Sequence, residues 1–170
     1  MFNAYLKIAN IPGQSTDSKH KDWIELQGFQ FHGMQQQAGK SLSSGQALSG
    51  GRSEMQAITF TKYIDKASPK IYEAVLSGTH IDNATLSVTR QTGSKSGPVE
   101  FFKYEVKQAM INDFNCQGIM EDEGGKEATP IPLETFSLVA TDHSWTYTET
   151  DVKGDKKGSV ASNHSFKSNT

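Results

Sequence analysis

The chain has 170 residues, which is enough for one ordinary domain and too few for two. Its 17 basic and 19 acidic residues give a formal charge of −2, so it lacks the basic surplus with which proteins bind nucleic-acid backbones without sequence preference. A single cysteine, Cys116, excludes an internal disulfide and a zinc site built from several thiolates. Composition therefore predicts one small globular domain without a nucleic-acid partner.

The first residues carry neither the charged region nor the uninterrupted apolar stretch of a secretory signal. No segment of the sequence approaches the roughly 20 consecutive apolar residues that a membrane-spanning helix needs. We therefore expect synthesis and folding in the cytoplasm and no membrane insertion. If the protein leaves the cell, we expect it to leave by a route other than general secretion.

Alternation of apolar and polar side chains, which is typical of half-buried antiparallel strands, recurs along the chain. It covers residues 2–8, 24–31, 58–60, 84–88, 102–106 and 136–140. After the third of these segments one helix is predicted, because Ser68 suits an N-cap, Pro69 suits a first helical turn and Gly78 can end a helix. Six or more strands with one short helix predict an all-β barrel or sandwich rather than a βαβ fold.

Three stretches break this pattern. Residues 33–53 are polar and glycine-rich, and a segment of that length without regular structure inside a small domain is usually functional or disordered. Residues 91–98 read as a Gly-Ser-Lys turn between two strands, and residues 121–127 form an acidic stretch that we interpret as a solvated turn. Beyond these three stretches, residues 151–170 contain almost no large apolar groups, so we predict a domain at 1–150 followed by a polar, flexible tail.

No catalytic, metal or cofactor site emerges from the motifs. Gly39-Lys40-Ser41 ends like a phosphate-binding loop, but the spacing to the preceding glycine is wrong and no amphipathic helix follows. Asp142-His143-Ser144 names the members of a hydrolase triad, yet consecutive strand residues point to opposite faces. The five histidines do not fall at metal-ligand spacing, and Cys116 follows an apolar stretch where we expect a buried packing residue. The sequence thus favours assembly or binding over catalysis.

Several short blocks, in order and at characteristic spacing, resemble one known family. Residues 13–26 read Gly-Gln-Ser-Thr-Asp-Ser-Lys-His-Lys-Asp-Trp-Ile-Glu-Leu, after an opening Ala-Tyr-Leu-Lys-Ile. Asp-Lys-Ala-Ser-Pro precedes the predicted helix, and Trp145-Thr146-Tyr147 closes the last predicted strand. Together these blocks resemble the haemolysin-coregulated protein (Hcp) family, the tube protein of bacterial type VI secretion, over about residues 1–150. The matching positions are Gly13, Ser15, Asp17, His20, Ile24, Glu25, Ser68, Pro69, Trp145 and Tyr147.

This resemblance implies a tight antiparallel β-barrel with one short flanking helix, assembled into hexameric rings. In the family the rings stack into a tube that a contractile sheath drives out of the cell, and members carry or chaperone effectors in the lumen. Sheath, spike and effector proteins are therefore the expected partners, and export from the bacterial cytoplasm to the outside or into target cells is expected without a signal peptide.

The resemblance also implies a role for the long stretch after the second predicted strand, because in the family it reaches a neighbouring ring or subunit. We therefore expect a ring-stacking loop comprising Gly39, Lys40, Leu42, Gly45, Leu48, Gly50, Gly51 and Arg52. The sequence predicts a non-enzymatic tube subunit; the alternative from another class is a monomeric β-barrel that binds a small ligand or a carbohydrate.

Overall fold

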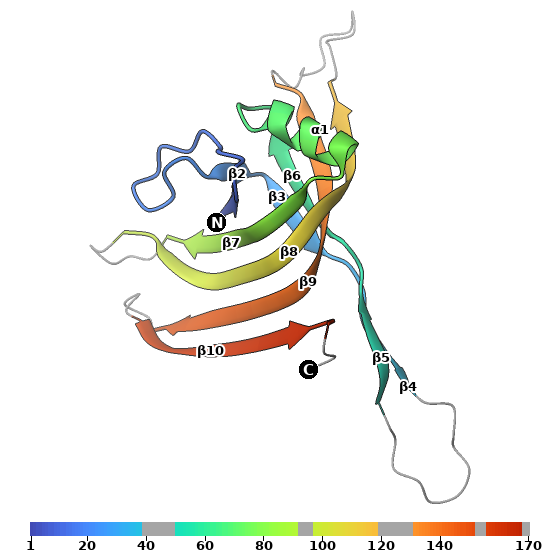
Figure 1. Cartoon of the computed structure of the whole chain (residues 1–170). Helices are drawn as coiled ribbons and strands as arrows, with labels where there is room; N and C mark the ends of the chain where they lie inside the picture. The colour runs from blue at the N-terminus through green and yellow to red at the C-terminus, as the bar shows by residue number, and fades with distance from the viewer. Residues whose placement is uncertain (39–49, 92–96, 119–130, 152–155, 168–170) are drawn as a thin grey trace, which may run out of the picture.

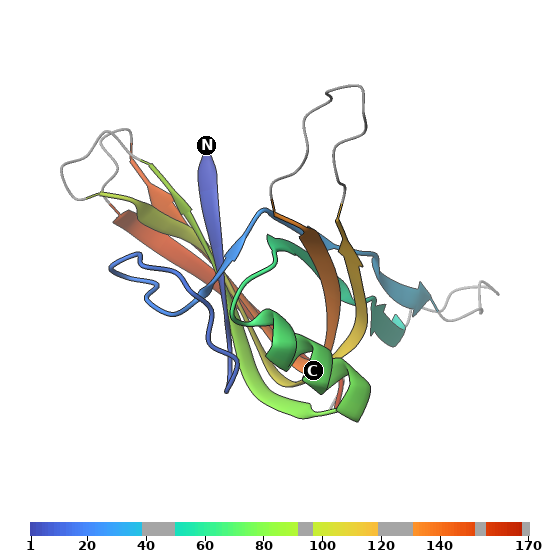
Figure 2. The ribbon, with the colours of Figure 1, turned by 90° about the horizontal axis from the view of Figure 1, so that it is seen from above.

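A computed structural model describes residues 1–38, 50–91, 97–118, 131–151 and 156–167 of the chain. The described elements, in chain order, are β1 (Phe2–Ile8), β2 (Ile24–Leu26), β3 (Gly28–Phe31), β4 (Met34–Ala38), β5 (Gly50–Met55), β6 (Ile58–Tyr63), α1 (Ser68–Ser77), β7 (His80–Arg90), β8 (Val99–Gln117), β9 (Leu133–Thr150) and β10 (Lys156–Ser165). The ribbon shows strands curving round a common interior, with α1 beside one end (Figures 1 and 2). The predicted β-dominated fold with one short helix is confirmed.

Eight strands form one antiparallel sheet in the order β2-β1-β7-β8-β9-β6-β3, and β10 also pairs with β9. The two strands at the ends of this order, β2 and β3, follow each other in the sequence. At its own end β2 pairs with β1, and at the other end β3 pairs with β6. Gln27, the single residue between β2 and β3, donates its backbone N–H to the carbonyl oxygen of Thr61 at 2.8 Å. One continuous segment, residues 24–31, therefore supplies the strands at both ends of the sheet order.

The core lies inside the curve of the sheet and consists mainly of every second residue along each strand, as the pleat requires. The largest fully buried apolar side chains are Leu6, Ile24, Ile58, Phe60, Ile71, Leu86, Tyr104, Ile111, Phe136 and Leu138. In β8 the parity of burial changes, since Tyr104 and Val106 are buried before Gln108 and Ala109 and Ile111 after it. Gln108 has a positive φ of 49° at this change. This allows one 19-residue strand to contribute to the core along both of its halves.

Helix α1 begins differently from the prediction. The N-cap residue is Ala67, which makes no side-chain cap, while Pro69 stands in the first turn as expected. The Ser68 side chain is buried and donates its hydroxyl to Glu134 Oε2 at 2.7 Å, so it faces the interior instead of capping the helix. Gly78 ends the helix in the left-handed conformation, with φ 62°, which glycine adopts without steric cost.

The glycine-rich stretch after β3 is more regular at its two ends than predicted. Strands β4 and β5 pair in an antiparallel two-stranded sheet, with Met34 opposite Met55, and this pair projects away from the main sheet (Figure 1, lower right). Gly50, Gly51 and Arg52 belong to β5. The remaining predicted loop residues, Gly39, Lys40, Leu42, Gly45 and Leu48, lie outside the described residues.

The predicted flexible tail is wrong for residues 156–165, which form strand β10 along β9 from Thr150 to Asp142. The side chains of β10 are mostly exposed, so backbone hydrogen bonds hold the strand without burial of apolar side chains. This is why apolar alternation gave no signal for it. The boundary of the domain at residue 150 stays a prediction.

Candidate functional site

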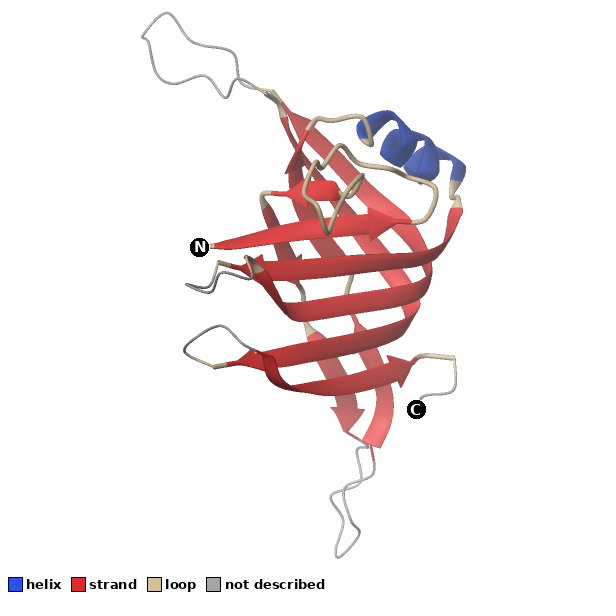
Figure 3. Ribbon diagram, turned by 90° about the vertical axis from the view of Figure 1, so that its left-hand side faces the viewer, coloured by secondary structure: helices blue, strands red, loops and turns tan. Residues whose placement is uncertain are grey.

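Strands β7, β8, β9 and β10 lie side by side and form a continuous surface (Figure 3). Register brings polar side chains into rows across all four strands. One row is Asn83, Lys107, Asp142 and Ser165; the next is Thr85, Glu105, Ser144 and Asn163. The intervening positions turn to the other face, where Leu86, Tyr104 and Trp145 pack in or against the core. The four strands therefore form a sheet with one polar and one mainly apolar face.

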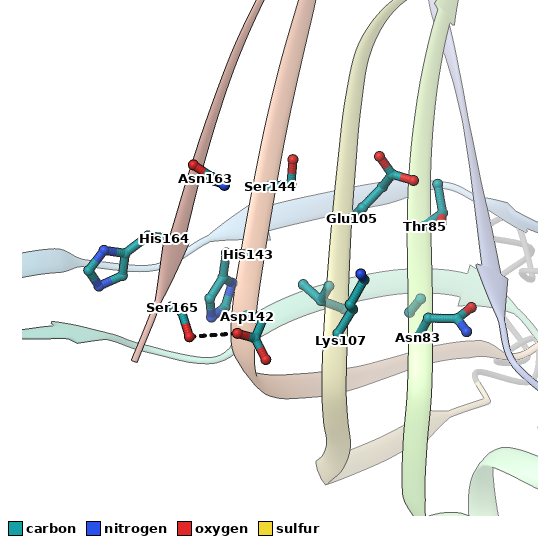
Figure 4. A pocket seen from close by; sticks show the side chains of 12 residues that line it. Asn83, Thr85, Glu105, Lys107, Asp142, His143, Ser144, Asn163, His164 and Ser165 are labelled. Carbon is teal, nitrogen blue, oxygen red and sulfur yellow. Dashed lines mark hydrogen bonds between the residues drawn. The ribbon is translucent and has the colours of Figure 1, made fainter. Parts of the chain in front are cut away.

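The polar rows line a concave groove that Figure 4 shows from close by. Asp142 accepts a hydrogen bond from the Ser165 hydroxyl at 2.6 Å, which joins β9 to β10 within the groove. That hydrogen bond and a second one from the Thr141 hydroxyl hold the pKa of Asp142 below its ordinary value. The two carboxylates and the single lysine of these rows stand among hydroxyl and amide groups, so the surface is polar and carries a small negative charge.

His143 is buried beneath this groove. Its Nε2 donates to the carbonyl oxygen of Ala140 at 3.1 Å, so its Nδ1 accepts the Tyr104 hydroxyl at 2.6 Å. Burial lowers the pKa of His143, and burial raises the pKa of Tyr104. Its ring lies nearly parallel to that of Trp145, with 5.7 Å between the ring centroids. This neutral, hydrogen-bonded histidine therefore acts as a packing residue, which agrees with the sequence-based rejection of Asp142-His143-Ser144 as a triad.

The segment between β1 and β2 carries four of the ten family-motif positions, Gly13, Ser15, Asp17 and His20. Gly13 is required there, because a Cβ at this position would lie 2.2 Å from the carbonyl oxygen of Trp23. Asp17 Oδ1 accepts the backbone N–H groups of Lys19 and His20 at 2.9 and 3.0 Å, which closes a tight turn. Although burial acts to raise it, these bonds and the one from the His20 ring hold the pKa of Asp17 below its ordinary value.

His20 joins this segment to the main sheet. Its Nδ1 lies 2.8 Å from Asp17 Oδ1, its Nε2 lies 2.8 Å from the Ser87 hydroxyl of β7, and its ring stacks on Tyr5. Asp17, His20 and Ser87 have the connectivity of a hydrolase triad, which the spacing in sequence did not reveal. However, Ser87 is fully buried and donates its hydroxyl to Glu100, so it offers no accessible nucleophile. The arrangement secures the fold of the segment.

A second polar network lies beneath α1. Lys62 and Glu134 are both fully buried and form an ion pair with 2.6 Å between Nζ and Oε2. Lys62 also pairs with Asp65 at 2.9 Å and donates to the Ser68 hydroxyl at 2.9 Å. Tyr72 donates its hydroxyl to Glu134, and burial together with this carboxylate raises the pKa of Tyr72. Ser68, a family-motif position, thus contributes to a network that fastens α1 to β6 and β9.

The other motif positions divide between core and surface. Ile24 is buried, Glu25 is exposed opposite Tyr5, Ser15 is buried, and Tyr147 is 47% exposed on β9. Cys116, expected to be buried, is exposed near the end of β8. Within the described residues no group of three or more His, Cys, Asp or Glu side chains could hold a metal ion. No helix in the described part of the chain is long and apolar enough to cross a membrane.

A β-dominated subunit with a polar sheet face and polar networks that secure its fold has the features of a structural or binding protein. The family comparison says which kind, since residues 5–147 match the family described as type VI secretion system effector, Hcp. The chain therefore belongs to the Hcp family of type VI secretion tube proteins, which are structural and non-enzymatic, form hexamers and carry effectors. Proteins of this family are secreted by the type VI system.

Individual relatives agree with this assignment. The chain is 28% identical over 140 residues to "Protein hcp1" of Pseudomonas aeruginosa, which covers 82% of this chain and 81% of that protein. A solved structure described as a type six secretion system protein superimposes with a TM-score of 0.86 at 29% identity, covering 100% of this chain and 99% of the other. Hcp1 from Salmonella typhimurium gives a TM-score of 0.72 at 25% identity, with 99% and 97% covered.

Proposed function

We propose that this chain forms hexameric rings that stack into the tube of a type VI secretion machine, with the polar face of β7, β8, β9 and β10 turned toward the lumen. The tube is proposed because the chain belongs to the Hcp family. The orientation of the polar face toward the lumen is supported by the difference between the two faces of the sheet. A lumen wall must stay hydrated and must not adhere to cargo through exposed apolar groups. The rows that include Thr85, Glu105, Ser144 and Asn163 meet that requirement.

The orientation of this face is testable by blocking the lumen. Replacing Ser144 with Trp places a large side chain in the middle of the polar rows. We expect rings to assemble while co-purification of an effector falls at least tenfold. Lys70→Trp, on the exposed surface of α1, is the matched control and should leave effector binding unchanged. Normal effector binding by Ser144→Trp rings would contradict the orientation.

The proposal includes closure of the main sheet into a tight barrel. Support comes from residues 24–31, which pair with β1 through β2 and with β6 through β3, and from the backbone hydrogen bond of Gln27 to Thr61. A closed sheet leaves no free edge at this point for uncontrolled pairing with other chains. Subunits then contact one another through surfaces other than this sheet edge, which suits a protein that must form rings of defined size.

Ring formation is measured by native mass. Six subunits of 18.7 kDa give a ring of about 112 kDa. A ring needs a head-to-tail interface made from two different patches, and we expect strand edges and aromatic contacts to carry it, because surface ion pairs are each worth under about 1 kcal/mol. The ring should therefore persist in 1 M salt. A strict monomer at high concentration would overturn the proposal and revive the monomeric ligand-binding barrel.

The stretch from Gly39 to Arg52 is proposed to act between rings. The stretch follows β4 and ends within β5; these two paired strands project from the main sheet, and the sequence places Leu42 and Leu48 between them. Burying one leucine contributes roughly 1.5–3 kcal/mol, and repetition round a ring multiplies the effect on stacking. Replacing both leucines with Asp should abolish stacking and secretion and leave the single ring intact. Wild-type levels of tubes and export in that variant would show that the stretch has no assembly role.

The partners follow from the tube. We propose that the rings form in the bacterial cytoplasm, meet sheath and spike components there, and leave the cell through the machine together with effectors in the lumen. Deletion of the sheath gene in the source bacterium should retain the protein inside the cell. Export at normal levels without the sheath would contradict this route.

A further inference from the structure

Four lysines from four separate segments converge on one groove at the end of the main sheet. Lys7 comes from β1, Lys19 from the segment before β2, Lys103 from β8 and Lys156 from β10. The remaining lining residues are His20, Trp23, Thr85, Thr89, Val99 and Glu100. We call this the lysine groove. In a chain with a net charge of −2, such a concentration of positive charge needs a reason.

The lysines of the groove are poorly compensated. No carboxylate of the described residues lies within ion-pair distance of Lys7, Lys19 or Lys156. Lys7 lies over the Trp23 ring at 5.9 Å and Lys19 donates to the carbonyl oxygen of Pro98 at 3.1 Å. Of the four, only Lys103 has an ion-pair partner in the described part of the chain, Glu105 at 2.8 Å. Like charges held together in this way favour an anionic ligand.

The floor of the groove leaves the positive charge of the lysines in excess. Glu100, the one acidic lining residue, accepts the hydroxyl hydrogen of Ser87. Asp17 Oδ1 lies 2.8 Å from His20 Nδ1, and the Ser87 hydroxyl lies 2.8 Å from His20 Nε2, so these polar groups are hydrogen-bonded to one another beneath the groove. Four lysines against the single acidic lining residue leave the groove with a net positive charge.

We infer that the lysine groove, which lies at one end of the polar face and shares Thr85 with it, binds at the rim of the lumen the acidic run Glu121–Glu127 of a second copy of this chain, in the neighbouring ring; this rests on the proposed tube. The run contains Glu121, Asp122, Glu123 and Glu127 with a single lysine, Lys126. The groove lies at the beginning of β8, whereas the run follows the end of β8. The 14 residues from Lys103 to Gln117 correspond to about 46 Å of strand contour. The residue that ends β8 before the run, Gln117, is therefore at the opposite end of that strand from the groove, and the two patches differ in charge, as contacts between successive copies in a stack require.

The chemistry of the groove suits a carboxylate-rich peptide. Lysine ammonium groups on flexible stems pair with carboxylates without the fixed planar geometry that arginine imposes. Trp23 and Val99 supply apolar surface for the peptide between the charges. Each exposed ion pair is weak, but six junctions per ring act together, which gives a stack that is stable and sensitive to salt.

Charge reversal with rescue tests the inference. Lys7→Glu/Lys19→Glu should reduce tube yield at least tenfold in a sedimentation assay, and Glu121→Lys/Asp122→Lys/Glu123→Lys should do the same. Both variants should keep the ring mass of about 112 kDa. Combining all five substitutions in one chain restores opposite charges and should recover most of the tubes. Lys66→Glu/Lys70→Glu, at exposed sites outside the groove, is the matched control and should stack normally.

Each outcome decides one point. Normal tubes from Lys7→Glu/Lys19→Glu, or failure of the five-fold variant to recover while both parent sets lose stacking, would overturn the inference. Saturable binding of inorganic pyrophosphate to the groove at micromolar concentration, without effect on stacking, would overturn it in favour of a small polyanion. A wild-type protein that forms no ring at all would refute the proposed function, a result that the ring mass distinguishes from loss of stacking alone.

Discussion

Two polar networks hold this subunit together. They differ in whether their last groups are buried inside the protein or reach its surface. The network of Lys62, Asp65, Ser68, Tyr72 and Glu134 is closed, because Lys62 and Glu134 are fully buried and find their partners inside the protein. The network that runs from Asp17 through His20 and Ser87 to Glu100 ends at the lysine groove on the surface.

The difference indicates a division of tasks. A closed ion pair is costly to assemble and still costlier to break, so it determines where α1 sits against β6 and β9. The second, open network is partly exposed at Asp17, whose side chain is 28% exposed, so the bonds of that carboxylate contribute less to stability than buried ones. It fixes the segment before β2 in place and holds Lys19 and Trp23 at the rim of the groove. The first network thus serves the fold alone, and the second also shapes a surface for assembly.

The largest effect is expected in the closed network. Glu134→Leu leaves Lys62 buried with Asp65 as its only carboxylate, and losing one partner of a buried pair costs about 3–5 kcal/mol. Urea unfolding measures this loss. The double variant Lys62→Met/Glu134→Leu removes both charges and should recover part of it. Equal stability of Glu134→Leu and wild type would show that the pair contributes nothing.

Gly13→Ala comes next, because its methyl group would meet the backbone of Trp23 at 2.2 Å and the segment before β2 has to shift. We expect a loss of about 2–3 kcal/mol in unfolding free energy. Gly33→Ala is the control, since its Cβ would meet only the Gln56 side chain at ordinary contact distance, 3.9 Å. Equal effects of the two substitutions would contradict the close approach.

Asp17→Asn tests the open network and should cost about 1 kcal/mol at pH 7, reduced from a buried value because the Asp17 side chain is 28% exposed. The folded-state pKa of Asp17 lies below its ordinary value of 3.8, so its contribution is complete above pH 4 and is lost as the pH falls through the folded value. The difference in stability between wild type and Asp17→Asn should therefore shrink below pH 4. A difference that is constant with pH would exclude this role for the carboxylate.

The smallest effect concerns His143, whose folded-state pKa burial lowers from the ordinary 6.5. The unfolded chain therefore binds a proton at a higher pH than the folded protein, and stability falls as the pH drops below 6.5. We expect His143→Gln to reduce the loss of stability between pH 7 and pH 5 by about 1 kcal/mol or less. Thermal melts across that range measure the slope, and parallel slopes would show that His143 titrates as in the unfolded chain.

Local pattern predicted much of the fold. Alternation located most strands of the main sheet, Pro69 and Gly78 located the helix, and the blocks around His20 and Trp145 identified the family. These signals are visible in sequence because the pleat places every second side chain in the core and because a helix start and stop favour particular residues. Strands β4, β5 and β10 were not predicted, since they are held by backbone pairing and carry little apolar alternation.

What only the tertiary structure decided is which distant residues meet. Lys62 and Glu134 are 72 residues apart, and His20 and Ser87 are 67 residues apart. No spacing rule reaches across such distances, because their contact depends on strand order and register. For the same reason the lysine groove is invisible in the sequence, where its four lysines are scattered among seventeen basic residues. The sequence by itself determined the class of fold and the family; the path of the chain through the sheet decided which charges are neutralised inside and which remain at the surface.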